Sequence, residues 1–351
     1  MKTAISFPDW VMLEIEHLAR YSLLILLFCS TFLFSQKYPN KSVDSALNRG
    51  LHQIVNQEFQ SAKRTFENLD RNFPKLPFGK IYLCAVEITK SEAFGTEPDK
   101  VYIDSLFRSA DDLIKKNFSA DKKNIWSNYF SALLKGYRAY YNALQGDYFA
   151  ALSEGLASIS LFEECLKIDS AFYEAYTALG TYLYWKSEKT EMFTWLPFIH
   201  DEREQGIAML RKATEHNGYN NFTASYFLIW ILENEGLYAE ALKVAENMVH
   251  QFPNSRFFRY GYAHLLTKSE SKKAAAEFQK LLRRAKSDND RYNQVVAIQR
   301  LAELYFASGD YEKAKNLCDE ALSIDGFSEY TKSKLSYRLN KLEEIRKSLA
   351  K

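Results

Sequence analysis

The sequence predicts an all-α solenoid of about seven helical hairpins, closed at its C-terminal end by a capping helix. Two observations favour this fold. Apolar residues recur with the period of an α-helix through most of the chain after residue 37, and no convincing strand alternation interrupts them. The 351 residues also contain only 13 Gly and 7 Pro, which are too few for the many turns of an all-β fold.

The clearest motif lies near the C-terminus, where residues 298–314 read IQRLAELYFASGDYEKA. Small residues at Ala302, Ala314 and Ala321 let two helices approach, while Leu301 and Tyr305 fill the space between them. This pattern resembles the tetratricopeptide repeat (TPR) family, whose unit is two antiparallel helices. The resemblance implies a TPR-like α-solenoid, of an irregular, exported bacterial type, that binds a protein or peptide without catalysis.

The pattern recurs along the chain with decreasing regularity. Residues 221–253 align well, with Gly236 in the tight turn and Pro253 after the second helix. Looser units are expected at 42–74 and 256–290, the latter with a short turn that lacks Gly. Further helices are expected at 78–94, 99–116, 125–144, 148–168 and 205–215. Residues 329–349 place Leu335, Leu339, Leu342 and Ile345 on one face, as a capping helix requires.

Residues 1–36 form a separate N-terminal region ahead of the predicted superhelical domain at 37–351. Residues 21–34 read YSLLILLFCSTFLF, which is too short for a standard transmembrane helix but suits the core of a signal peptide cleaved after Ser35. The preceding residues lack the usual positive bias, since Asp9, Glu14 and Glu16 oppose Lys2 and Arg20. A cleaved signal, an uncleaved membrane anchor and an apolar terminal helix therefore remain open. The first two indicate a periplasmic or otherwise extracytoplasmic protein.

Composition argues against nucleic-acid binding, because the net charge is only +2 and the sequence pI about 8.1. Cys84, Cys165 and Cys318 each lie in an apolar helical pattern and are expected to be buried thiols. The six His residues stand apart, and no common catalytic or phosphate-binding motif occurs. Residues 200–204 (HDERE) place a His beside carboxylates, but an acidic helix start explains them more simply. We expect no enzyme activity, metal or cofactor.

The TPR resemblance implies a ligand-binding concave face lined by the first helix of each hairpin. Aligned through Gly236 and Gly180, it assigns to this face Tyr226, Trp230, Glu233, Asn234, Thr177, Thr181, Tyr184 and Trp185, with Arg259 alongside. Aromatic side chains with a few polar groups suit an extended peptide. Packing of Trp230 and Tyr184 on neighbouring repeats is the alternative.

An apolar insertion at 186–201 (KSEKTEMFTWLPFIHD) interrupts the fourth unit. Its Trp195 and Phe198 either plug the solenoid or form part of a recognition surface, because exposed apolar loops are costly in water. The sequence thus predicts a binding scaffold that acts outside the cytoplasm. A membrane-tethered assembly factor, and a carrier of an apolar small molecule or lipid in an internal cavity, are the alternatives.

Overall fold

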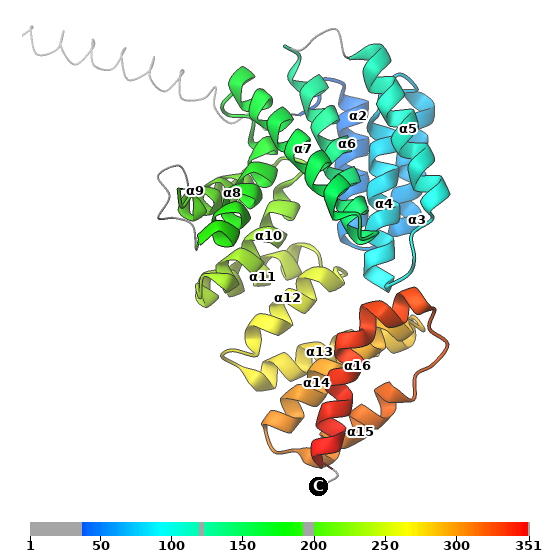
Figure 1. Ribbon diagram of the computed structural model, residues 1–351, viewed down its shortest axis with the longest axis vertical. Helices are drawn as coiled ribbons and strands as arrows, with labels where there is room; N and C mark the ends of the chain where they lie inside the picture. The colour runs from blue at the N-terminus through cyan, green and yellow to red at the C-terminus, as the bar shows by residue number, and fades with distance from the viewer. Residues whose placement is uncertain (1–36, 119–122, 192–199, 350–351) are drawn as a thin grey trace, which may run out of the picture. The chain divides into compact units, whose positions relative to one another are not determined.

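The computed structural model describes residues 37–118, 123–191 and 200–349, and the chain from Tyr38 onward forms one compact unit (Figure 1). The regular elements in these ranges are all helices, which confirms the predicted all-α class. They are α2 (Lys41–Val55), α3 (Phe59–Asn72), α4 (Phe78–Phe94), α5 (Lys100–Asn117), α6 (Ile125–Leu144), α7 (Tyr148–Ile168), the 3-10 helix η1 (Tyr173–Ala175), α8 (Tyr176–Thr190), α9 (Arg203–Glu215), α10 (Asn221–Asn234), α11 (Tyr238–Gln251), α12 (Arg256–Leu266), α13 (Ser271–Ser287), α14 (Arg291–Ala307), α15 (Tyr311–Leu322) and α16 (Glu329–Leu349).

Consecutive helices pack in pairs, from α2–α3 to α14–α15, so the described residues contain the seven hairpins that the sequence predicts. The last helix, α16, packs on α14 and α15 and buries Leu335, Leu342 and Ile345, as expected of a cap. No helix in the described ranges combines the length and hydropathy needed to cross a membrane. The apolar run at 21–34 lies outside those ranges.

Three of the inter-helix turns depend on a glycine with positive φ. Gly146, Gly236 and Gly309 have φ of 81°, 72° and 79°, and a Cβ added to any of them would meet no atom within 4 Å. The backbone conformation alone therefore selects glycine at these turns. The first hairpin turns through Gln57 instead, with φ of 62°.

The fourth hairpin is closely packed because two glycines face each other across α8 and α9. A Cβ at Gly180 would lie 2.7 Å from the carbonyl oxygen of Gly206, and a Cβ at Gly206 would lie 2.6 Å from that of Gly180. Helix α8 continues to Thr190, so residues 186–190 belong to a helix and not to the insertion expected at 186–201. Residues 192–199 lie outside the described part of the chain.

A buried carboxyl group joins the third, fourth and fifth hairpins. Glu174, in η1, is 3% exposed and accepts hydrogen bonds from the backbone N–H of Tyr219 and, at 3.0 Å, from the side-chain amide of Asn220. The Tyr129 hydroxyl on α6 lies 3.4 Å from the same carboxyl group. Burial, opposed by these hydrogen bonds, raises the pKa of Glu174 to about 7.

The Tyr219 hydroxyl extends this cluster to the first hairpin. It lies 2.6 Å from the carboxylate of Asp44 on α2 and accepts a hydrogen bond of 2.8 Å from the backbone N–H of Tyr38. These contacts join residues 175 and 181 positions apart. In a regular solenoid each repeat contacts only its neighbours, so this cluster, here called the Glu174–Tyr219 node, is an additional constraint.

A second set of long-range contacts joins the end of α4 to the C-terminal helices. The Asn293 side chain on α14 donates to the carbonyl of Ala93 at 2.7 Å, and the Thr331 hydroxyl on α16 donates to that of Gly95 at 2.9 Å. The second hairpin is therefore fixed to the seventh hairpin and the cap.

The raised pKa of Glu174 predicts that stability falls with rising pH. The stability contributed by the protonated carboxyl is complete below its ordinary pKa near 4.5 and is lost as the pH rises through about 7. Glu174→Gln should remove this dependence, which amounts to about 2–3 kcal/mol between pH 5 and 8. Urea unfolding of both proteins at the two pH values measures it, with the exposed Glu163→Gln as control. If the free energy of unfolding changes between the two pH values by the same amount in wild type and Glu174→Gln, the Glu174 carboxyl is not the cause of the pH dependence.

Candidate functional site

Helix α7 exposes an apolar stripe. Tyr148, Phe149, Leu152 and Leu156 are 74%, 86%, 62% and 47% exposed. Phe149, Leu152 and Leu156 follow the i, i+3, i+7 spacing of a helix-packing seam, so they share one face. Of this 21-residue helix only Ser158, Phe162 and Cys165 are buried. A contiguous apolar surface on a helix is typical of an interaction site.

The rotation of α7 is fixed by its contacts with α6, so the stripe cannot simply turn inward. Glu154 forms ion pairs with Lys135 at 3.0 Å and Arg138 at 3.4 Å, and the Ser158 hydroxyl donates to the carbonyl of Ala132 at 2.8 Å. Asp147 caps the first turn by accepting from the backbone N–H of Ala150 at 3.0 Å. Glu154 and Ser158 occupy the α6 side of the helix and leave the stripe on the other side.

Sequence reasoning recognised the length of this helix but missed its exposed face. The available signal was that α7 (YFAALSEGLASISLFEECLKI) is apolar on more than one side in its first half. A second helix that packs on a single partner can bury only one of these sides.

Four of the residues predicted for the concave face, Tyr226, Trp230, Glu233 and Asn234, lie on α10, and most of their polar groups are already bonded. The Trp230 ring lies 6.2 Å from Tyr226 and 5.5 Å from His264. The Glu233 carboxylate lies 2.6 Å from His264 Nε2. His264 in turn faces Arg300 of α14, whose Nη2 lies 3.2 Å from Nδ1. We call Trp230, Glu233, Tyr260, His264 and Arg300 the His264 cluster.

The contacts of the His264 cluster determine which nitrogen of the neutral His264 imidazole carries the proton. Arg300 can only donate, so Nδ1 must accept, and the proton lies on Nε2, which donates to Glu233. Burial, with the positive charge of Arg300, lowers the pKa of His264 against the opposing effect of Glu233. The Arg300 Nε also donates to the Tyr260 hydroxyl at 3.0 Å. The cluster is therefore a hydrogen-bonded tie between α10, α12 and α14.

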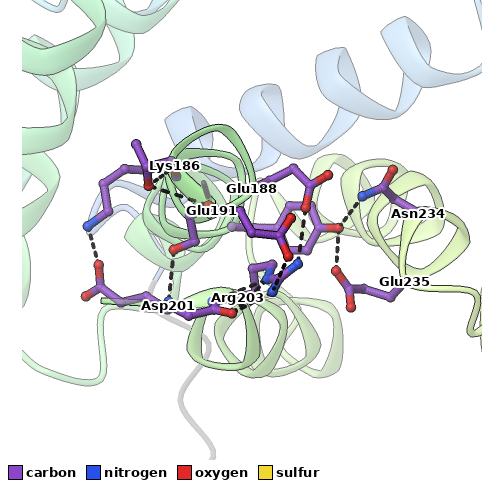
Figure 2. A network of polar contacts seen from close by, with 11 residues as sticks. Lys186, Glu188, Glu191, Asp201, Arg203, Asn234 and Glu235 are labelled. Atoms are coloured by element: carbon purple, nitrogen blue, oxygen red, sulfur yellow. Dashed lines mark hydrogen bonds and ion pairs between the residues drawn. The ribbon is translucent and has the colours of Figure 1, made fainter. Parts of the chain in front are cut away.

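Tyr184 is fully buried, which makes it a packing residue between α8 and α10. Its hydroxyl donates to Glu235 at 2.7 Å and accepts a 2.7 Å hydrogen bond from Asn234 (Figure 2). Tyr184 and Asn234, both predicted to bind a partner, therefore bind each other. Trp185 is half-buried against Tyr184, with the two rings 5.1 Å apart.

The other residues predicted to bind a partner lie apart from these. Arg259 lies on α12 and pairs with Glu277 of α13 at 2.8 Å. Thr177 is buried, and the Thr181 hydroxyl donates to its carbonyl at 2.8 Å. Trp195 and Phe198 lie outside the described residues.

The acidic segment at 200–204 forms an ion-pair network that joins the end of α8 to the start of α9. Arg203 lies 2.7 Å from Asp201, 3.4 Å from Glu188 and 3.6 Å from Glu191 (Figure 2). Hydrogen bonds from Arg203 lower the pKa of Asp201. In the described part of the chain no three His, Cys, Asp or Glu side chains gather as metal ligands would.

The seventh hairpin has the small-residue packing expected of a TPR unit. Between α14 and α15, Ala302, Ala314 and Ala321 are fully buried and Leu301 is 1% exposed, so the small residues lie where the helices approach. Cys84, Cys165 and Cys318 are buried free thiols, as expected. The chain has a TPR-like fold.

Comparison with known proteins gives distant similarities. No protein-family model and no curated protein matches the chain. One similar solved structure is YrrB, described as a TPR protein with an unusual peptide-binding site, at 17% identity and TM-score 0.42, covering 64% of this chain and 97% of YrrB. A TPR protein from Parabacteroides merdae has 14% identity and TM-score 0.38 over 87% of this chain and 100% of that one. Yeast Tom70 has 17% identity and TM-score 0.38 over 89% and 66%. Similarities this distant say nothing about ligands, and the TPR-like fold rests on the hairpin geometry.

The tautomer of His264 is a direct test of the cluster. We expect nitrogen NMR of the imidazoles to show the Nε2–H form persisting below the pH at which an unperturbed histidine, near 6.5, becomes protonated. Arg300→Gln should raise the pKa of His264, because it removes the neighbouring cation. An Nδ1–H tautomer, or no response to Arg300→Gln, would contradict the assigned geometry.

Proposed function

We propose that this TPR-like chain is a non-catalytic scaffold that binds a protein partner through the exposed face of α7. The observation that carries the proposal is the apolar stripe of Tyr148, Phe149, Leu152 and Leu156. Burying a side chain such as Phe149 or Leu152 stabilises a complex by about 2 kcal/mol. Three or four such residues on a rigid helix are enough to anchor a specific interface, even after the cost of association.

The partner that fits this face is an amphipathic helix. The i, i+3, i+7 spacing of Phe149, Leu152 and Leu156 matches the seam along which two helices interdigitate. The C-terminal half of the same face carries Ser160 and Glu163, which would meet polar or basic residues of the partner.

The residues assigned from the TPR resemblance remain a second part of the proposal. Tyr226 and Trp230 are half-buried and keep some accessible surface for a peptide. Glu233 and Asn234 are already bonded to His264 and Tyr184, so a peptide would have to compete with those contacts. This competition favours α7 as the main contact surface.

Action outside the cytoplasm is proposed on the sequence of residues 21–34 alone. N-terminal sequencing of the mature protein distinguishes the exported scaffold from the membrane-tethered assembly factor. A start at Gln36 supports cleavage after Ser35, and retention of residues 21–34 supports the tether.

Photo-crosslinking tests the binding face. With p-benzoylphenylalanine at Phe149 of the full chain in the cells that produce it, we expect discrete protein adducts. With the same group at Tyr337, which is 70% exposed on α16, we expect none. Leu152→Asp should abolish the Phe149 adducts while changing stability by less than about 0.5 kcal/mol, because residue 152 is at the surface.

A further variant separates the two parts of the proposal. If Trp230→Ala also removes the adducts, the contact extends to the His264 cluster; if only Leu152→Asp does, it is confined to α7. If the crosslinker gives no adducts at either Phe149 or Tyr337, or the same adducts at both, binding at α7 is contradicted.

A further inference from the structure

A hollow between the start of α12 and the end of α13 is lined mainly by cations. Its volume is about 310 Å³, and its lining contains no carboxylate. The lining residues are Pro253, Asn254, Arg256, Arg259, Lys280, Leu281 and Arg284. The N-terminus of α12 lies at the same place and adds the positive end of its dipole.

Three carboxylates near the hollow leave part of this positive charge without a counter-charge. Glu277 pairs with both Arg259, at 2.8 Å, and Lys280, at 2.6 Å, so one acid serves two cations. Arg284 donates to the neutral carbonyl of Asn254 at 2.6 Å and lies 3.6 Å from Asp288.

Asp288 is itself shared, because it also pairs with Arg256 at 2.8 Å. The third acid, Asp290, pairs with Arg256 and caps α14 through the backbone N–H of Asn293. Four cations thus face three acids. Burial, followed by the positive charge of Arg256, lowers the pKa of the Arg284 guanidinium.

Arg256 is the most buried of these cations, at 8% exposed. Its guanidinium lies over the Phe94 ring at 5.2 Å, and its two terminal nitrogens bond Asp288 and Asp290. Its buried Nε has no hydrogen-bond partner among the described residues. With both terminal nitrogens bonded and Nε out of reach of solvent, Arg256 contributes positive charge to the hollow and not a free donor.

We propose that this hollow binds a small phosphoryl dianion. The donors come from two directions, with Arg259 on α12 and Lys280 and Arg284 one turn apart on α13, while Arg256 adds positive charge. A tetrahedral oxyanion presents oxygens toward both helices at once, whereas a planar carboxylate accepts mainly in its own plane. The site is separate from α7 and does not depend on the proposed function.

Calorimetric titration of the full chain with inorganic phosphate, at constant ionic strength in chloride, tests the proposal. We expect saturable binding that Arg284→Gln weakens about tenfold, since a charge-assisted hydrogen bond is lost. Arg283→Gln is the matched control, because it makes the same charge change at the next, exposed residue, which does not line the hollow. It should change the affinity less than twofold. Lys280→Gln, at a side chain 51% exposed, provides a second lining variant if Arg284→Gln does not fold.

Succinate in a parallel titration distinguishes a dicarboxylate from a phosphoryl group. Stronger binding of succinate than of phosphate would overturn the assignment. Absence of saturable phosphate binding, or equal weakening by Arg283→Gln and the lining variants, would overturn the site itself.

Discussion

The Glu174 carboxyl and the Tyr219 hydroxyl hold together hairpins that are far apart in the sequence. Glu174 bonds the backbone and side chain at the start of α10, while Tyr219 reaches Asp44 on α2 and the backbone of Tyr38. All these groups are removed from water at least in part, so each needs the others to satisfy its hydrogen bonds. The first, third, fourth and fifth hairpins are therefore fixed to one another, which neighbour packing alone would not ensure.

The candidate surfaces differ in how completely the fold satisfies their groups. The polar groups of His264 and Tyr184 find partners within the chain. Helix α7 packs mainly on α6, so Phe149 and Leu152 stay exposed. At the hollow beside Arg256 the cations are satisfied only in part, because Arg259 and Lys280 share Glu277, and Arg284 shares Asp288 with Arg256. Binding is best sought where the fold leaves groups unsatisfied.

The hairpins could be predicted from the sequence because their determinants are local. Gly309 and Gly236 specify turns by their own backbone conformation, and Ala302 specifies a close helix approach by its size. The Tyr219–Asp44 contact could not be predicted, since it spans 175 residues and involves residue types common at surfaces. Tyr184 followed the expected spacing for an exposed groove residue, yet its hydroxyl found partners on α10 and the side chain became buried.

Native-state hydrogen exchange of wild type and Tyr219→Phe tests most directly whether the Glu174–Tyr219 node couples distant hairpins. The substitution keeps the ring but removes the hydroxyl that serves Asp44 and Tyr38. If the node couples the hairpins, the amides of α2 and α10 lose protection together, by a similar free energy of about 1–2 kcal/mol. Loss of protection confined to α10, with α2 unchanged, would show that the hairpins are held only by their neighbours.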